Sequence, residues 1–182
     1  TQLRAALRAS AYGPLQIMFP MVGSLEDIRK AKEYLNLAKE QLKERKQQFD
    51  EQIRIGIMIE IPAIALIADL AAEEVDFASI GSNDLTQYLS AADRMNPEVA
   101  AYYKSDSTAM LRLLGFVFWE FSKREKEISV CGEMAGNPET AQLLVGLGAR
   151  KLSMSSGNIA GVKAKLAECT LQELTALAEK KL

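Results

Sequence analysis

The sequence contains no histidine among its 182 residues. Histidine is the commonest general base, metal ligand and phosphoryl-accepting nitrogen at neutral pH, so any chemistry of this chain must use other groups. Cysteine is scarce as well: Cys131 and Cys169 are too few for a disulfide framework. Two thiols without a framework are typical of a protein of the reducing cytoplasm, where we expect this chain to reside.

Other features are missing too. No apolar run is long enough to cross a membrane, and no secretory signal pattern is present. The net charge of −2 gives no general attraction to nucleic acid or to an anionic membrane surface, so we expect neither as a partner. The chain begins at Thr1, without a methionine, inside a predicted helix. We therefore expect a fragment of a longer protein.

Short apolar runs alternate with helical stretches along the chain. With 48% hydrophobic and 25% charged residues, it can bury one core of ordinary size. The runs predict five strands, at Leu15–Val22, Ile53–Ile61, Val75–Ser82, Ile128–Gly132 and Lys151–Ser155. Helices are predicted at Thr1–Ala11, from Ser24 onward, and at Pro62–Ala72, Thr108–Glu125, Pro138–Leu147, Gly157–Glu168 and Leu171–Lys181. Such an alternation implies a parallel sheet, which can be an open sheet or a closed barrel.

Local signals refine this pattern. Ser24 with Asp27 three residues later predicts a capping box at the start of a long helix. The segment Asn83–Asp106 reads as a loop, and a βα connection of that length is often functional. The helix at Thr108–Glu125 is apolar nearly all round, which predicts that it is buried on two sides or covers a partner.

The most informative stretch is Asp76–Tyr88, which reads Asp-Phe-Ala-Ser-Ile-Gly-Ser-Asn-Asp-Leu-Thr-Gln-Tyr. A buried parallel strand ends there in small residues, and Asn83 and Asp84 follow at the mouth of the predicted sheet. One interpretation is that these two residues only cap the next helix. The other is that they belong to a functional site. Glu60 ends the preceding strand in the same way, so the carboxylates of Glu60 and Asp84 can converge on one cation such as Mg²⁺.

Six motifs, in this order along nearly the whole chain, resemble the phosphoenolpyruvate-utilising enzymes, and most closely the Enzyme I group of the bacterial sugar phosphotransferase system. They lie at Ile17–Met21, Met58–Ala63, Asp76–Tyr88, Ala92–Arg94, Val130–Gly136 and Leu152–Ser155. The resemblance implies a (β/α)8 TIM-type barrel that is incomplete, with only its last five strands present. Residues 1–182 would then be the C-terminal part of a phosphoenolpyruvate-binding barrel domain.

The resemblance also implies a site. Glu60 and Asp84 would hold Mg²⁺, although the sequence states no preference against Mn²⁺. Asn83, Asp84 and Arg94 would bind substrate, since an arginine fork and an amide both suit phosphate oxygens. Cys131 would be the acid that protonates the methylene carbon of the enolate to give pyruvate. Taken alone, Cys131 is more typical of an inert buried thiol.

The reaction implied is phosphoryl transfer from phosphoenolpyruvate to a histidine in another domain, and then to a histidine-containing phosphocarrier protein. Two alternatives stay open from the sequence. The chain can be the equivalent domain of pyruvate phosphate dikinase or phosphoenolpyruvate synthase, or a non-catalytic dimerisation module. A homodimer is expected in either case, because the family associates through this domain and Phe116, Trp119 and Phe121 cannot share one helical face.

Overall fold

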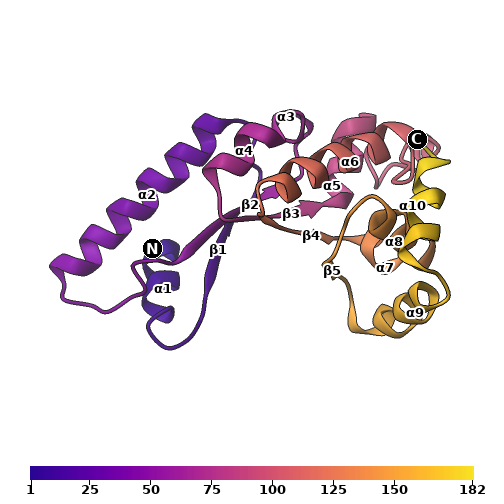
Figure 1. Ribbon diagram of the computed structural model, residues 1–182. Helices are drawn as coiled ribbons and strands as arrows, with labels where there is room; N and C mark the ends of the chain where they lie inside the picture. Colours follow the sequence, from indigo (N-terminus) through magenta and orange to yellow (C-terminus); the bar gives the residue numbers. More distant parts are fainter.

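The computed structural model describes all 182 residues. Its centre is one parallel sheet in which neighbouring strands follow the order of the chain (Figure 1). The strands are β1 Gln16–Phe19, β2 Arg54–Ile59, β3 Phe77–Gly81, β4 Glu127–Cys131 and β5 Leu152–Ser153. All five predicted strands are confirmed. Four are shorter than their apolar runs, and β4 has the predicted length but begins one residue earlier.

Ten α-helices and one 3-10 helix follow and flank the strands. They are α1 Gln2–Ala9, α2 Leu25–Glu44, α3 Pro62–Leu66, α4 Ala68–Glu74, α5 Ser82–Ser90, η1 Pro97–Val99, α6 Thr108–Lys123, α7 Glu133–Gly136, α8 Pro138–Gly146, α9 Ser156–Ala167 and α10 Leu171–Glu179. The predicted capping box at the start of α2 is confirmed, with Ser24 and Asp27 bonded to each other's backbone N–H groups. None of these helices combines the length and the apolar composition that a membrane crossing requires.

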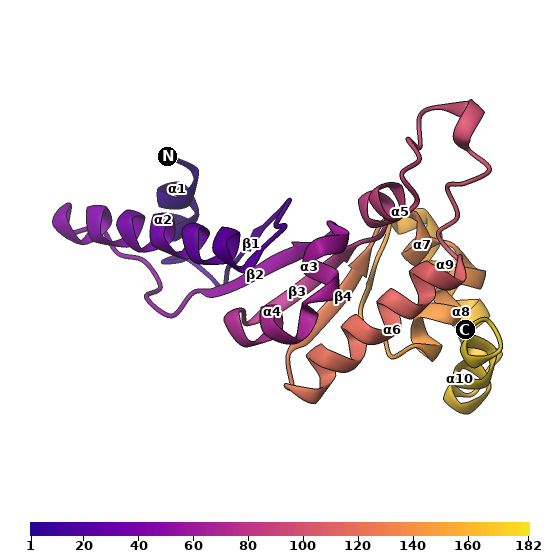
Figure 2. The ribbon, with the colours of Figure 1, turned by 90° about the horizontal axis from the view of Figure 1, so that it is seen from above.

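Two predictions of local structure were wrong. The helix predicted at Pro62–Ala72 is two helices, because Ile67 adopts φ −117° and ψ 33° and breaks the regular turn between α3 and α4. The segment predicted as a long loop begins with a helix, α5, which starts at Ser82 directly after β3. The remaining loop, residues 91–107, contains η1 and extends away from the body of the molecule (Figure 2).

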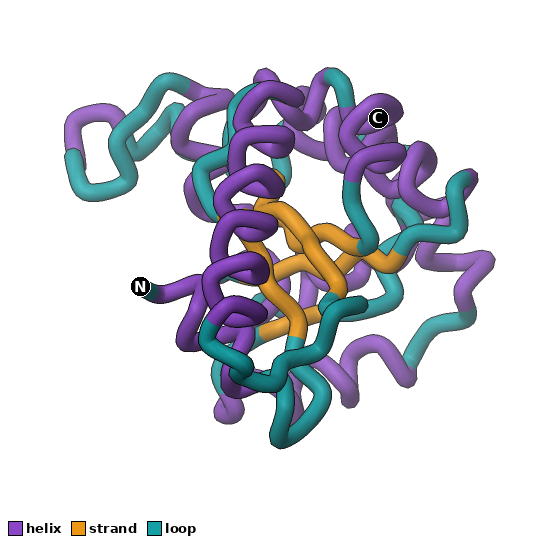
Figure 3. The backbone as a smooth tube through the Cα atoms, turned by 90° about the vertical axis from the view of Figure 1, so that its left-hand side faces the viewer, coloured by secondary structure: helices purple, strands orange, loops and turns teal.

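The strands present two different faces. Alternate residues such as Ile57, Ile80 and Val130 are buried in one large apolar cluster with residues of α3, α4 and α6, so these helices cover that face. The other residues of the same strands, among them Met58 and Ser79, which are partners in the ladder, point away from the helices. Figure 3 shows the strands in orange at the middle of the molecule, with helices around them.

The sheet is open, because β1 pairs only with β2 and β5 only with β4. Sequential parallel strands with helices along one face are the construction of a (β/α)8 barrel. The structure therefore agrees with a TIM-type barrel that is incomplete, with five of its strands in the chain. All five carboxyl ends lie at the same edge of the sheet, where the chemistry of such barrels is located.

Candidate active site

Glu60 follows the last residue of β2 and is buried, with 4% of its surface exposed. Its Oε1 accepts a hydrogen bond of 2.7 Å from the backbone N–H of Met21, which lies just beyond β1. Met21 adopts φ +55°, a left-handed conformation that is uncommon for a residue with a side chain. The backbone beyond β1 thus directs an N–H group at the Glu60 carboxylate.

Gly81, the last residue of β3, makes room for the same carboxylate. A Cβ atom at this position would lie 2.8 Å from Oε2 of Glu60, closer than van der Waals contact allows. Glycine within a strand often marks the close approach of another group, and here that group is the second carboxylate oxygen of Glu60. The Glu60 side chain therefore lies against the end of β3. The last residue of that strand, Gly81, precedes Asp84 by three residues.

Asn83 and Asp84 lie in the first turn of α5, whose N-cap is Gly81 with no side-chain cap. The interpretation that they only cap this helix is therefore wrong. The side-chain oxygen of Asn83 instead accepts a hydrogen bond of 3.0 Å from the N–H of Glu133, the first residue of α7. This contact ties the segment after β3 to the segment after β4 and fixes the orientation of the Asn83 amide.

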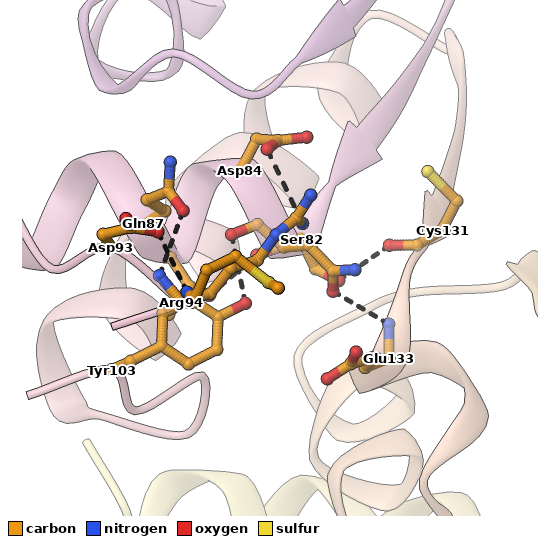
Figure 4. A network of polar contacts seen from close by, with 11 residues as sticks. Ser82, Asp84, Gln87, Asp93, Arg94, Tyr103, Cys131 and Glu133 are labelled. Atoms are coloured by element: carbon orange, nitrogen blue, oxygen red, sulfur yellow. Dashed lines mark hydrogen bonds and ion pairs between the residues drawn. The ribbon is translucent and has the colours of Figure 1, made fainter. Parts of the chain in front are cut away.

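Asp84 forms an ion pair with Arg94, in which Oδ1 of Asp84 and Nη1 of Arg94 are 3.7 Å apart. Both side chains are about two-fifths exposed, at 37% and 41%, so solvent screens the pair and a ligand can reach both charges. The backbone N–H of Arg94 donates a hydrogen bond of 3.2 Å to the side chain of Gln87 on α5. The structure thus brings Arg94 back to the helix that carries Asp84, as Figure 4 shows.

Cys131 ends β4 and is half-buried. Its thiol donates a 3.4 Å hydrogen bond to the carbonyl of Ile80, and its own carbonyl accepts a 2.7 Å bond from the hydroxyl of Ser82. Cys131 and Asn83 line one shallow depression of about 370 Å³, together with residues from the end of β5 and the start of α9. Cys131 therefore borders solvent-accessible space at the mouth of the sheet and is not part of the apolar core.

Gly132 follows Cys131 with φ +101°, a conformation that favours glycine. An added Cβ atom would lie 2.5 Å from the hydroxyl of Ser82 and 2.8 Å from the side-chain oxygen of Asn83. Glycine is required at this position because the side chains of α5 occupy the space that a larger residue would need.

Comparison with known proteins shows to which family the chain belongs. The family described as "PEP-utilising enzyme, PEP-binding domain" matches residues 1–171. The chain belongs to this family.

Two curated relatives are similar to nearly the whole chain. The chain is 47% identical over 173 residues to multiphosphoryl transfer protein 2 of Escherichia coli strain K12, covering 95% of the chain and 21% of the relative. It is 44% identical over 180 residues to the phosphoenolpyruvate-protein phosphotransferase of Bacillus subtilis strain 168, covering 99% and 32%. The chain therefore spans about a fifth to a third of the length of these curated relatives.

A solved structure supports the fold independently of sequence. A citrate lyase from Burkholderia xenovorans LB400 aligns with a TM-score of 0.63 at 16% identity, covering 98% of this chain and 59% of that chain. Its fold is TIM-barrel-like, and this PEP-binding domain matches somewhat more than half of it. The fold class predicted from the sequence is confirmed, with the barrel open in this chain.

The residues present fit a divalent ion of the hard, oxygen-preferring kind. No group of three or more Cys, Asp or Glu side chains gathers anywhere in the chain, so an all-protein metal cage is absent. What the PEP-binding domain offers is two carboxylates at the ends of adjacent strands, Glu60 buried and Asp84 accessible. Magnesium is typically held in this way, by one or two carboxylates completed by substrate oxygens and water.

Sequence reasoning missed two residues at this edge of the PEP-binding domain. Met21 was noted only as part of a motif, and nothing in the sequence indicates its left-handed backbone or its bond to Glu60. Tyr103 was not noted at all. Its hydroxyl donates a 3.2 Å hydrogen bond to the carbonyl of Asn83, twenty residues earlier in the chain. An aromatic residue in a polar loop is the only signal that could have pointed to it.

Proposed function

We propose that this chain supplies the phosphoenolpyruvate and Mg²⁺ site of a phosphoenolpyruvate-protein phosphotransferase. One observation carries the proposal: in a chain of the PEP-binding family, Glu60 lies against the last residue of β3, and the helix that follows β3 carries Asp84, which is paired with Arg94. The relatives named above are a multiphosphoryl transfer protein and a phosphoenolpyruvate-protein phosphotransferase, which favours this activity over the dikinase and synthase alternatives.

In this proposal Glu60 and Asp84 hold the metal, and Arg94 and Asn83 bind the phosphate. The Asn83 oxygen is already bonded to Glu133, so its amide N–H groups remain to donate to a phosphate oxygen. Arg94 offers a planar fork of donors suited to the same group. Bound Mg²⁺ would add positive charge where negative charge develops on the phosphoryl and enolate oxygens.

Cys131 has the proposed role of proton donor. Phosphoryl transfer breaks the bond between phosphorus and the enol oxygen and leaves the enolate of pyruvate. The thiol of Cys131 then gives its proton to the methylene carbon, which yields pyruvate and a thiolate that solvent reprotonates. The half-buried position of the thiol at the rim of the depression supports this role, because it is accessible to substrate yet partly shielded from water.

The phosphoryl acceptor is proposed to be a histidine outside these 182 residues, since the chain contains none. From there the group would pass to a histidine-containing phosphocarrier protein. We also propose a homodimer and a cytoplasmic location, supported by exposed aromatic residues on α6 and by two unpaired cysteines.

Reconstitution tests the proposal. The chain alone, with phosphoenolpyruvate, Mg²⁺ and carrier protein, should give no phosphorylated carrier. Addition of a polypeptide that carries the acceptor histidine and the remaining barrel strands should restore phosphorylation and release one pyruvate per phosphate transferred. A Glu60→Gln chain mixed in the same way is the control and should stay inactive. Phosphorylation of the carrier by the isolated chain would contradict the proposed division of roles.

A further inference from the structure

Arg94 lies at the base of an exposed loop. Residues 91–107 leave the body of the molecule after α5 and return to it at α6 (Figure 2). The outer part is open to solvent, with Met95 81% and Tyr102 71% exposed. Where the loop leaves α5, Gln87 accepts two hydrogen bonds of 3.2 Å. The backbone N–H of Ala92 donates to its backbone carbonyl, and the backbone N–H of Arg94 donates to its side-chain oxygen.

Tyr103 holds the returning side of this loop. It lies nine residues after Arg94, and its hydroxyl donates a 3.2 Å hydrogen bond to the backbone carbonyl of Asn83. Figure 4 shows the phenol close to the Arg94 side chain, next to the end of β3. The loop therefore closes on α5 twice, through Gln87 and through Tyr103, and Arg94 belongs to the first of these attachments.

The environment of Tyr103 keeps its hydroxyl a hydrogen-bond donor. Desolvation raises the pKa of the phenol, and the nearby negative charge of Glu133 raises it further, while the Arg94 guanidinium lowers it. The net change is upward, so the phenol is protonated throughout the neutral range. An unprotonated phenolate could not donate to the Asn83 carbonyl, and the attachment would be lost.

We propose that Tyr103 is a positioning residue that holds Arg94 beside Asn83 and Asp84 in readiness for a phosphate group. That Arg94 meets a phosphate rests on the proposed function, whereas the ordering of Arg94 by Tyr103 does not. An arginine on a free loop would lose much conformational entropy on binding an anion, and this loss reduces affinity. A loop fixed at both sides has already incurred that loss in folding, so the main consequence of Tyr103 is tighter substrate binding.

A purely structural role is the competing explanation. In that case the hydroxyl of Tyr103 would only fasten the loop, and Arg94 would behave in the same way without it. The two explanations differ in whether removal of the hydroxyl changes Arg94 itself. Tyr103→Phe keeps the ring and removes the hydroxyl, and Tyr102→Phe is a matched control on the neighbouring, solvent-exposed tyrosine.

The first measurement needs no substrate. Exchange of the Arg94 backbone amide with water is followed by NMR in the parent chain and both variants. Loss of one neutral hydrogen bond should speed this exchange by about two- to tenfold in Tyr103→Phe and leave it unchanged in Tyr102→Phe. Equal exchange rates in all three proteins would overturn the proposal, whether or not the chain binds phosphoenolpyruvate.

The second measurement is the affinity for phosphoenolpyruvate in the presence of Mg²⁺, by NMR titration of the same chains. Tyr103→Phe should weaken binding by about two- to tenfold, and it should have no further effect in a chain that already carries Arg94→Ala. An equal loss in both backgrounds would show that Tyr103 does not act through Arg94 and would overturn the proposal. Absence of binding by the parent chain would contradict the proposed function instead, and the exchange rates would still decide the role of Tyr103.

Discussion

The two ends of one sheet face differ in how their charges are satisfied. At the amino ends of the strands, Glu127 forms ion pairs with both Arg54 and Lys151. Its Oε2 is 3.4 Å from Nη1 of Arg54. Arg54 also donates a 3.2 Å hydrogen bond to the carbonyl of Asp76. At the carboxyl ends of the same strands, Glu60 has one backbone donor, and Asp84 has one distant arginine.

The difference separates structural from functional charge. A network in which every charge has a close partner gains nothing by binding a ligand, and it contributes to the fold. Charged and polar groups that have few hydrogen-bond or ion-pair partners contribute little to the fold. Such groups remain able to bind a cation or an anion. In TIM-type barrels the carboxyl ends carry the chemistry and the amino ends carry stability, and the distribution of partners in this chain follows that division.

The sharpest test of this contrast at the carboxyl ends concerns Cys131. In the reconstituted enzyme, Cys131→Ala should slow release of pyruvate by about a hundredfold or more, because the proton donor to carbon is lost. Binding of phosphoenolpyruvate should be retained. Cys169→Ala changes the cysteine that follows α9 and accepts a hydrogen bond from Gln142 of α8, and it should have normal turnover.

Solvent isotope labelling gives an independent reading of the same residue. In deuterium oxide the parent should add deuterium to one face of the methylene carbon, and Cys131→Ala should lose this selectivity. Normal turnover with intact selectivity in the alanine variant would mean that Cys131 only packs at the end of β4.

A paired substitution compares the two ends directly. Glu60→Gln or Asp84→Asn should weaken Mg²⁺-dependent binding of phosphoenolpyruvate on the order of a hundredfold, since each removes a charge with which the metal pairs. Glu127→Gln removes the same charge at the other end and should leave this binding unchanged. Isothermal titration calorimetry with and without Mg²⁺ measures both effects. Equal losses from Glu60→Gln and Glu127→Gln would erase the distinction between the ends.

A similar contrast exists on α6. Phe121 is fully buried, whereas Phe116 is 37% and Trp119 66% exposed, as expected for aromatic residues that cannot share one face. Phe121→Ala should cost about 3–5 kcal/mol of folding stability because it leaves a cavity in the core.

Trp119→Glu should leave stability within about 0.5 kcal/mol and weaken self-association. Urea unfolding and sedimentation velocity distinguish the two outcomes. Unaltered sedimentation of the Trp119→Glu chain would mean that this aromatic face is not the dimer contact.

The smallest expected effect is the pH dependence of the amino-end network. The pKa of the Glu127 carboxyl lies below its usual range, mainly because Lys151 donates a hydrogen bond to it. A depressed carboxyl pKa gives stability that is present above the unfolded pKa of about 4.3 and is lost as pH falls through the folded pKa.

Glu127→Gln should therefore lower stability at pH 7 by about 1 kcal/mol or less and flatten the loss of stability below pH 4. Thermal unfolding between pH 3 and 7 measures both changes. If the stability of the variant fell as steeply below pH 4 as that of the parent chain, Glu127 would not be the group responsible for this pH dependence.

Much of this architecture could be predicted from local sequence. The strands are short apolar runs bounded by breakers, so their existence and order were evident, and with them the placement of Glu60 and Asp84 at the strand ends. The break at Ile67 was not evident, because the apolar sequence runs through it without interruption. The helix α5 was not predicted, because it begins after Gly81 without a capping side chain and the segment from Asn83 onward reads as a loop.

The missed site contacts share a physical reason. Met21 with Glu60, Asn83 with Glu133, and Tyr103 with Asn83 all join residues far apart in the chain. A sequence shows which residues can donate or accept, but the pairing depends on which strands become neighbours and how each loop returns. Only the assembled sheet brings these partners together.

The most direct test of the account is a map of where the substrate binds. Phosphoenolpyruvate and Mg²⁺ are titrated into the isotope-labelled chain, and NMR shifts are followed at both ends of the sheet. We expect saturable, Mg²⁺-dependent shifts at Glu60, Asn83, Asp84, Arg94 and Cys131, with none at Arg54, Glu127 and Lys151. Shifts confined to the amino ends, or binding that is indifferent to Mg²⁺, would contradict the account.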